Sequence, residues 1–299
     1  MTDGANVRQL LIDRLRSLAA NDGFTAAPLD GITYMRADTS QPKAPVLQEP
    51  SFVLLAQGMK RGYLGAETYT YHAGQCLVVT VPMPFDCDTQ VGPDGAMLAV
   101  AVRIDSSLVS ELLLTMDAPP QASANPGERG MMITDMTPGL VDALNRLLAA
   151  LASPMDTRVL GAGLLRELHY QMLLGPAGEC LRSLVSRQGR LGRVRRSIDS
   201  LYRDPAAPFS VAALAAEAGM SQSGYHQAFR EVTGHAPMQY LKNLRLHRAR
   251  QLIVQQGFGS AQAAYEVGYA SATQFSREFK RLFGCPPSAI ARQPSEAAE

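Results

Sequence analysis

The sequence, which has 299 residues, contains no apolar run long enough to cross a membrane. One of the longest runs, CLVVTVPMPF at residues 76–85, contains two prolines and falls well short of the ~18 residues that a span needs. The first 20 residues mix acidic side chains and arginines with apolar positions, which is unlike a secretory signal. We therefore expect a cytoplasmic protein without a membrane partner.

Cysteine is also scarce. The four cysteines are far apart and form no CxxC pair: Cys76, Cys87, Cys180 and Cys285. This pattern does not indicate a disulfide framework and is typical of a protein in a reducing compartment. We expect each thiol to be a small buried apolar side chain.

What the sequence does contain is an uneven distribution of charge. Residues 181–299 hold 16 Lys+Arg against 8 Asp+Glu, whereas residues 1–180 hold 12 against 19. The two halves therefore carry +8 and −7, although the whole chain has a net charge of only +1. Such asymmetry indicates a basic module for a polyanion, joined to an acidic module with another task.

The first half predicts an opening amphipathic helix followed by many short strands. The apolar face of the helix carries Val7, Leu10, Leu11, Leu15 and Leu18. The β-rich runs are ITYMR (32–36), SFVLLAQG (51–58), ETYTYHAG (67–74), QCLVVTV (75–81) and AMLAVAVRI (96–104). Gly65-Ala66 predicts a tight hairpin between two tyrosine-bearing strands. Together these patterns predict a barrel or sandwich.

Helical patterns follow this strand-rich part. They cover residues 106–116, 138–152 and 156–174, with a loop at 117–130 between the first two. The last two helices can form an antiparallel hairpin or pack against their counterparts in a second subunit. From about residue 194 the chain is helical throughout, with seven short helices. We therefore predict two domains, 1–187 and 188–299.

The second half contains an internal repeat at an offset of 49 to 50 residues. Ser221, Phe229, Gly234 and Pro237 recur as Ser271, Phe279, Gly284 and Pro287. Each copy predicts a helix, a turn and a second helix, with serine as the N-cap and glycine as the C-cap of the second helix. This is the plan of a helix-turn-helix unit, expected at about 211–234 and 260–284.

Projection at 100° per residue divides the second helix of each copy into two faces. One face is aromatic and apolar in both copies. The opposite faces carry Ser223, His226, Gln227 and Arg230 in the first copy, and Thr273, Gln274, Ser276, Arg277 and Lys280 in the second. Arginine, glutamine and hydroxyl groups read base edges in the major groove of DNA, and cations bind its phosphates. We therefore predict that both helices are recognition helices for double-stranded DNA.

A single helix at residues 237–256 is expected to join the two copies. Its 20 residues would span about 30 Å, close to the ~34 Å between successive major-groove faces on one side of DNA. One chain could thus place both recognition helices in adjacent grooves.

At these residues the chain resembles the AraC/XylS family of bacterial transcription regulators. The resemblance covers about residues 193–291 and rests on the two repeats, LAAEAGMSQSGYHQAFREVTGHAP and AAYEVGYASATQFSREFKRLFGCPP. It implies that bases are read by Ser223, His226 and Gln227 in the first unit, and by Ala272, Thr273, Gln274 and Arg277 in the second. It also implies RNA polymerase as a partner and activation as the outcome.

The first half is similar to the N-terminal domain of one branch of that family, a cupin-like β-barrel with trailing helices. The stretches that carry this resemblance are GAETYTYHAGQCLVVTVPMPF and LAVAVRIDSSLVSELLL. Such a domain implies an effector site and dimerisation. Strand alternation suggests that the cavity is lined by Tyr69, Tyr71, Cys76, Val78 and Thr80.

Three alternatives to an effector-binding domain stay open. The domain could only dimerise, or it could sense through the thiols of Cys76 and Cys87. It could also be a metal-dependent cupin enzyme, but that chemistry needs a cluster of histidines and a carboxylate, and residues 1–180 contain only His72 and His169. We therefore expect no catalytic residue, metal or cofactor. The chain is interpreted as a two-domain α+β, homodimeric, effector-responsive activator of transcription.

Overall fold

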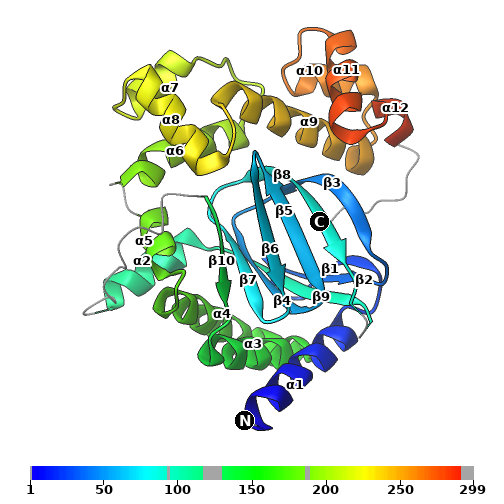
Figure 1. Ribbon diagram of the computed structural model, residues 1–299, viewed down its shortest axis with the longest axis vertical. Coiled ribbons are helices and arrows are strands. Elements are labelled where there is room, and N and C mark those ends of the chain that lie inside the picture. The colour runs from blue at the N-terminus through cyan, green and yellow to red at the C-terminus, as the bar shows by residue number, and fades with distance from the viewer. Residues whose placement is uncertain (1, 93–94, 117–129, 186–188, 291–299) are drawn as a thin grey trace.

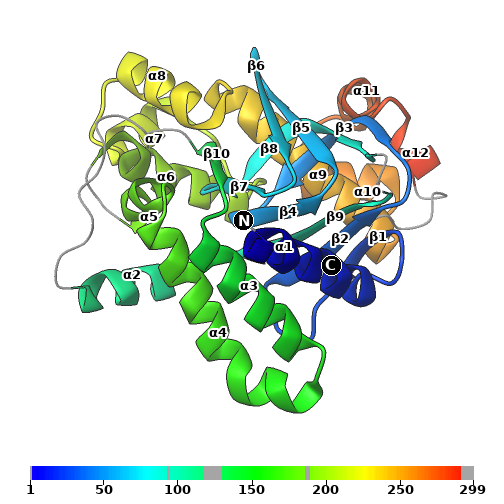
Figure 2. The same ribbon diagram turned by 60° about the horizontal axis from the view of Figure 1, so that its bottom comes forward.

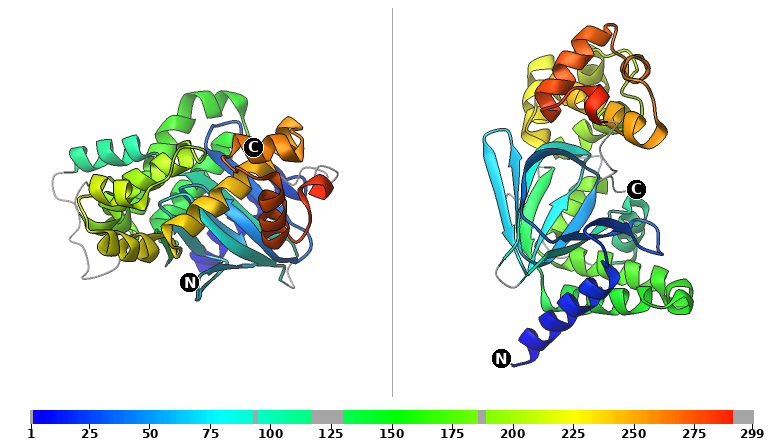
Figure 3. Two further views of the ribbon diagram at one scale, coloured as in Figure 1. Left: turned by 90° about the horizontal axis from the view of Figure 1, so that it is seen from above. Right: turned by 90° about the vertical axis from the view of Figure 1, so that its right-hand side faces the viewer.

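The computed structural model describes residues 2–92, 95–116, 130–185 and 189–290, and it has a two-domain α+β architecture (Figure 1). The strands and the first helices form an N-terminal domain, and the remaining helices form a C-terminal domain at one end of it. Figure 3 shows the same division from two further directions. Among these residues, no helix combines the length and the apolar content needed to cross a bilayer.

The strands form two antiparallel sheets. They are β1 (Gly23–Ala26), β2 (Ile32–Ala37), β3 (Gln41–Gln48), β4 (Ser51–Gln57), β5 (Met59–Leu64), β6 (Glu67–His72), β7 (Gln75–Val79), β8 (Met83–Gln90), β9 (Met97–Arg103) and β10 (Met131–Asp135). The larger sheet has six strands in the order β1-β2-β9-β4-β7-β10, and the smaller has four in the order β3-β8-β5-β6. The expected β-rich domain is therefore a sandwich of two sheets, which do not close into one hydrogen-bonded barrel in the described part of the chain.

Helices cover one face of the sandwich and form the whole of the C-terminal domain. They are α1 (Thr2–Leu18), α2 (Ser106–Thr115), α3 (Pro138–Leu151), α4 (Pro154–Leu174), α5 (Gly178–Val185), α6 (Gly189–Arg203), α7 (Val211–Glu217), α8 (Gln222–Thr233), α9 (Pro237–Gln256), α10 (Ser260–Glu266), α11 (Ala272–Phe283) and α12 (Pro287–Ile290).

One apolar core lies between the outer face of the six-stranded sheet and helices α1 to α5. Phe52, Leu54 and Val100 of the sheet pack in one cluster with Leu144 and Leu148 of α3. Every residue of β4 is buried because this central strand is covered on both faces, by helices on one side and by the second sheet on the other.

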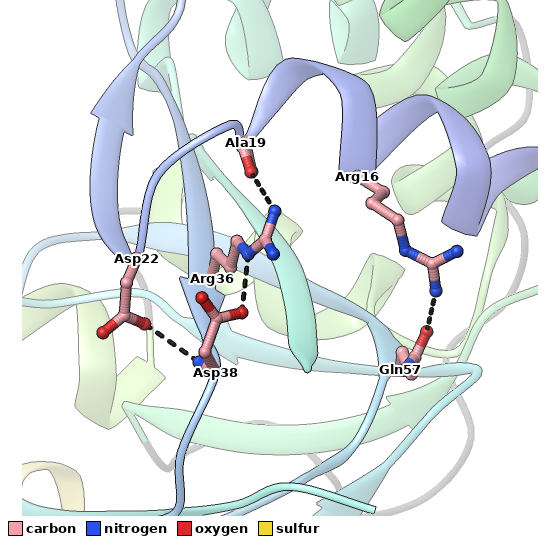
Figure 4. A network of polar contacts seen from close by, with 6 residues as sticks. All are labelled: Arg16, Ala19, Asp22, Arg36, Asp38 and Gln57. Atoms are coloured by element: carbon pink, nitrogen blue, oxygen red, sulfur yellow. Dashed lines mark hydrogen bonds and ion pairs between the residues drawn. The ribbon is translucent and has the colours of Figure 1, made fainter. Parts of the chain in front are cut away.

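A polar network fixes the end of α1 to the sheet (Figure 4). The guanidinium of Arg36 on β2 donates to the carbonyl oxygen of Ala19 at 3.1 Å and to the carboxylate of Asp38 at 2.7 Å. The backbone N–H of Asp38 donates to Asp22, which lies between α1 and β1. These contacts hold α1 over the sheet edge where β1 and β2 pair.

A second apolar core lies between the two sheets and continues into the C-terminal domain. It joins Val53 and Leu77 of the six-stranded sheet to Tyr225 and Phe229 of α8 and to Tyr240 of α9. The first helix-turn-helix unit is therefore packed against the sandwich, because the two share buried side chains.

Backbone carbonyl groups complete this contact. The hydroxyl of Tyr240 donates to the carbonyl oxygen of Pro82 at 2.6 Å, and the N–H of Gly130 donates to the carbonyl oxygen of Val232 at 2.9 Å. A ring nitrogen of His235 lies 2.9 Å from the carbonyl oxygen of Pro84. The segment around residues 232–240 is thus held by hydrogen bonds to the β7–β8 connection, to the start of β8 and to the residue before β10.

A third, smaller core belongs to the second unit. It contains Phe275 and Phe279 of α11, Ala263 of α10, and Leu252 and Ile253 of α9. The second unit consequently has its own core, and α9 is the helix that contributes to both the second and the third core.

Most of the predicted elements are confirmed, including the hairpin at Gly65-Ala66, the antiparallel pair α3 and α4, and the seven C-terminal helices. In α1, Leu11 and Leu15 are buried as predicted, but Leu10 is 44% exposed because the buried face is narrower than the apolar stripe. Strands β1, β3, β8 and β10 were not predicted. The expected loop at 117–130 and the domain boundary at 187/188 fall largely on residues outside the described ranges.

The glycines that end the two recognition helices allow a matched test of domain packing. Gly234 and Gly284 both have left-handed backbones, with φ of 71° and 76°. A Cβ on Gly234 would lie 2.5 Å from Leu64 at the tip of the β5–β6 hairpin, whereas a Cβ on Gly284 would meet no atom within 4 Å.

Gly284→Ala is expected to lower the free energy of unfolding by about 1 kcal/mol, the cost of a left-handed alanine. Gly234→Ala should cost about 1–3 kcal/mol more, because the new methyl group overlaps Leu64. Chemical denaturation measures both losses. Adding Leu64→Ala to Gly234→Ala should remove part of the excess, and equal losses in the two single variants would show that the domains do not touch here.

Candidate functional site

The ends of α8 and α11 have the capping groups that the repeat predicts. The hydroxyl of Ser221 accepts a hydrogen bond from the N–H of Gly224 at 3.1 Å, and that of Ser271 accepts one from the N–H of Gln274 at 3.3 Å. Gly234 and Gly284 close the helices. Helices α7–α8 and α10–α11 thus form two helix-turn-helix units with the same terminal chemistry.

Helix α8 buries its aromatic face and leaves its polar face in solvent. Tyr225, Phe229 and Val232 are almost completely buried. All four side chains of α8 predicted to contact DNA are exposed: Ser223, His226, Gln227 and Arg230. The side-chain amide of Gln227 donates to Glu231 one turn later, at 2.9 Å.

Helix α11 repeats this division. Phe275 and Phe279 are fully buried, and their rings pack in a tilted arrangement with 5.4 Å between centroids. The four predicted contact residues are exposed, namely Thr273, Gln274, Arg277 and Lys280, while Ala272 and Ser276 are half-buried. Each unit therefore presents hydrogen-bonding groups and at least one cation on a solvent-facing surface.

A buried carboxylate, which the sequence analysis missed, fixes Gln274. Glu278 is 7% exposed and accepts three hydrogen bonds: from Gln274 Nε2 at 3.1 Å, from the hydroxyl of Tyr269 at 2.9 Å and from Lys242 Nζ at 3.2 Å. These donors come from α11, from the turn before it and from α9. The network orients the Gln274 amide and ties α11 to the connecting helix.

These hydrogen bonds set the protonation state of the network. Burial favours the neutral acid, but the hydrogen bonds from Gln274, Tyr269 and Lys242 outweigh it and leave the pKa of Glu278 below its ordinary value of 4.5. Burial and the hydrogen bond to Glu278 raise the pKa of Tyr269, so that its hydroxyl stays a donor. Glu278 is therefore a carboxylate at neutral pH.

The connecting helix α9 is one continuous element of 20 residues, as predicted. Its His247 is buried beside the Phe283 ring and near Arg250, and this environment lowers its pKa to about 3. The imidazole is thus neutral and acts as part of the core of the second unit.

The two recognition helices are not parallel in this structure. Figure 2 shows α8 lying across the view while α11 is seen close to end-on. Insertion of both helices into successive grooves of a straight duplex requires similar orientations. Simultaneous binding therefore needs either a change in the relation of the two units about α9 or a bend in the DNA.

A cavity of about 730 Å³ opens between the two sheets and reaches the C-terminal domain. Met35, Val53 and Leu77 of the six-stranded sheet line one wall, and Lys60, Tyr71, Phe85 and Cys87 of the four-stranded sheet line the other. Its mouth is bounded by α9 and α12, through His247, Arg250, Gln251, Val254, Gln255 and Ile290. A molecule of drug-like size fits such a volume, and it would contact both domains.

Of the five residues proposed to line the cavity, Tyr71 is in its wall. Tyr69 is half-buried and its hydroxyl donates to Glu67. Cys76 and Val78 point to the opposite face of the six-stranded sheet, toward the helices, because the inward residues of β7 are Leu77 and Val79. Thr80 is buried, and its hydroxyl lies 3.4 Å from the carbonyl oxygen of Gly130.

The thiols do not have the environment of reactive cysteines. Burial raises the pKa of Cys76 well above its ordinary range, and it raises that of Cys87 although Lys60 acts in the opposite direction. Both therefore stay protonated, whereas a reactive cysteine needs a stabilised thiolate. No cluster of three or more potential metal ligands occurs in the described ranges.

Two family models match the chain. Residues 28–180 match the AraC-type transcriptional regulator N-terminus, and residues 214–293 match a helix-turn-helix domain. The first match covers half of the chain and corresponds to strands β2 to β10 with helices α2 to α4. The second covers most of the two helix-turn-helix units.

Several curated relatives match about a third of the chain. The chain is 38% identical over 98 residues to the RCS-specific HTH-type transcriptional activator RclR of Escherichia coli (strain K12), covering 33% of this chain and 34% of that protein. It is 22% identical over 215 residues to the virulence regulon transcriptional activator VirF of Yersinia enterocolitica (serotype O:8), covering 71% of each. The chain spans about a third of the length of the first curated relatives it matches.

Solved structures with a similar fold include ToxT from Vibrio cholerae. The unsaturated fatty acid-bound form from strain SCE256 has a TM-score of 0.58 at 12% identity and covers 93% of this chain and 98% of ToxT. The form from strain O395 bound to (E)-4-(8-methylnaphthalen-1-yl)but-3-enoic acid has a TM-score of 0.55 at 11% identity, with 90% and 98% coverage. At this identity the likeness establishes the shared fold.

Glu278→Gln should test the buried network. We expect it to lower the free energy of unfolding by about 1–3 kcal/mol, because Tyr269 and Lys242 lose a charged acceptor. Because the pKa of Glu278 is lowered in the folded state, the stabilisation is present above pH 4.5 and is lost as the pH falls below that value. Chemical denaturation between pH 3 and pH 7 should therefore show that the free energy of unfolding falls less at acid pH in the variant than in the original protein.

Glu231→Gln is the matched control, since Glu231 is the exposed partner of Gln227 at the same helical spacing. It should change stability by less than about 0.5 kcal/mol. An equal effect of the two substitutions would contradict the role assigned to Glu278.

Proposed function

Because this chain belongs to the family of AraC-type transcriptional regulators, we propose that it is a sequence-specific DNA-binding regulator controlled by a small-molecule effector. One observation carries this proposal. Both α8 and α11 bury an aromatic face and expose a polar, cationic face. The exposed faces carry the types of side chain that bind base edges in a major groove.

The exposed residues take distinct roles in this proposal. Arg277 reads guanine through its guanidinium, and Gln274, oriented by Glu278, reads adenine through its amide. On α8, His226 and Gln227 read base edges, with Ser223 beside them. Arg230 and Lys280, near the ends of their helices, bind phosphates, and Thr273 contacts either group.

The effector acts through α9. This helix bounds the mouth of the cavity and also contributes to the cores of both helix-turn-helix units. A ligand that favours one position of α9 therefore changes how α8 and α11 are presented to DNA. ToxT, which shares the fold, is described with a bound fatty acid, so this architecture accommodates a ligand.

We further propose that the protein is a cytoplasmic homodimer that activates transcription with RNA polymerase, and that residues 1–187 and 188–299 are its functional domains. An exposed apolar surface on α4 supports dimerisation, since Met155, Val159 and Leu160 are 65%, 73% and 50% exposed. The same surface supports a second candidate function, that of a regulator whose N-terminal domain only dimerises. The cavity favours the effector-responsive form.

Arg277→Ala should weaken binding to the preferred duplex by about 1–3 kcal/mol and relax specificity at one base pair. The loss of the guanidinium removes a bidentate contact to one base. Fluorescence anisotropy with the preferred duplex and its single-base variants measures this. Equal weakening on every sequence would show that Arg277 binds phosphate and would refute its assigned role.

Lys280→Ala is the companion variant from the same helix. It should weaken binding about equally on all duplexes and reduce the slope of log K against log[salt] by about 1, because one phosphate contact is lost. A change in base preference would contradict this assignment.

A further inference from the structure

Three polar side chains form a row across the inner face of the four-stranded sheet. Lys60 on β5 pairs in register with Thr89 on β8 and with Tyr71 on β6. Directly opposed residues on one face of a sheet have neighbouring side chains. The row therefore brings one ammonium and two hydroxyl groups together inside the sandwich.

All three residues are buried, yet they satisfy little of one another's hydrogen-bonding capacity. Lys60 is 8% exposed, Thr89 5% and Tyr71 1%. Lys60 Nζ donates to Thr89 Oγ1 at 3.2 Å, and the described residues contain neither an ion pair of Lys60 nor a hydrogen bond of the Tyr71 hydroxyl. An ammonium has three donors, and a buried charge without a counter-ion is costly.

The surroundings of Lys60 supply no such counter-ion. The wall facing the row is apolar, with Leu77 and Val53. The acidic residues that line the cavity are at its rim and already have partners: Asp30 pairs with Arg103, and Glu49 accepts a hydrogen bond from Tyr202. The row of Lys60, Thr89 and Tyr71 therefore lacks a negatively charged partner within the cavity.

We propose that the cavity binds a carboxylic acid with an apolar body, and that Lys60 and Tyr71 hold its carboxylate. The ammonium and the hydroxyl are both donors, and a carboxylate accepts from both. The apolar body fills the rest of the space between the sheets toward α9. A neutral polyol does not suit this site because its other hydroxyl groups would face apolar walls. This proposal rests on the effector function proposed above and names the chemical class of the effector.

The position of Lys60 links such a ligand to the DNA-binding domain. Leu64, four residues along β5 on the same inward face, contacts the position of Gly234 at the end of recognition helix α8. The mouth of the cavity is bounded by α9, the helix that follows α8 in the chain. A carboxylate on Lys60 thus binds the strand that touches α8, and the apolar body of the ligand contacts the helix that joins both units.

The test compares linear carboxylates from butanoate to dodecanoate with their primary amides on the full chain. Thermal unfolding and titration calorimetry give the stabilisation and the Kd. At the best chain length, the acid is expected to bind about tenfold to a hundredfold more tightly than its amide, as a charge-assisted contact implies. Equal binding of acids and amides, or no stabilisation by any of the acids, would overturn the proposal.

Lys60→Met keeps the apolar stem and removes the charge, and it should abolish the preference for the acid. Lys43→Met is the matched control, because Lys43 lies on the exposed edge strand β3 and pairs with Asp86. It should leave the preference unchanged. If Lys60→Met does not fold, Tyr71→Phe serves instead and should weaken binding of the acid several-fold and binding of the amide less, because a hydrogen bond to a charged acceptor is the stronger one. Retention of the full acid preference in both cavity variants would refute the site.

Anisotropy with DNA on the same samples separates the two claims. Specific DNA binding by a chain that shows no acid preference would leave the proposed function standing and refute only the carboxylate site. Acid binding by a chain that does not bind DNA specifically would support the carboxylate site and refute the proposed DNA-binding function.

Discussion

One apolar core runs from the space between the two sheets into the first helix-turn-helix unit, and the relation of the domains depends on it. Tyr225, Phe229 and Tyr240 are fully buried in the same cluster as Val53 and Leu77. Hydrogen bonds to Pro82 in the β7–β8 connection and to Pro84 at the start of β8 reinforce this packing. Burial of such aromatic rings contributes several kcal/mol, so the first unit and the sandwich behave as one body. The second unit shares no comparable core with the sandwich in the described residues.

This asymmetry gives α9 its importance. It belongs to the shared core in its first half and carries the core of the second unit in its second half, and that second half also bounds the mouth of the cavity. Helix α11 is further fixed to α9 through Glu278 and Lys242. Because α8 and α11 are not parallel, the binding of both helices to DNA depends on the position of α9 (Figure 2). A ligand in the cavity contacts the same helix. Coupling between the two sites is thus a consequence of a shared element, which is the physical requirement for allostery.

The C-terminal domain could be predicted closely from the sequence because its signals are local. Serine caps, terminal glycines and a 3.6-residue period fix the ends and the buried faces of α8 and α11 without reference to the rest of the chain. The N-terminal domain could not be predicted to the same depth. Strand β3 contains Pro42 and Pro45, which are tolerated because it is an edge strand, and only the pairing of the strands shows that.

The same limit explains the cavity and the buried network. Alternation along β7 gives two faces, but whether Leu77 or Cys76 points toward the second sheet depends on where the chain crosses between sheets. Lys60 resembles an ordinary strand lysine until its register with Thr89 and Tyr71 is known. Glu278 lies on the same helix as the predicted contact residues, yet its role depends on Tyr269 and on Lys242, 36 residues away in the sequence. The orientation of β7, the environment of Lys60 and the role of Glu278 all depend on contacts between residues that are far apart in the sequence.

Selection of binding sites from random duplexes with the full chain tests the central claim most directly. The account predicts an enriched motif with two blocks, centred about one helical turn (~34 Å) apart, one block responding to substitutions on α8 and the other to substitutions on α11. Recovery of no enriched sequence, or of a motif that is unchanged when the exposed residues of both helices are replaced, would contradict it.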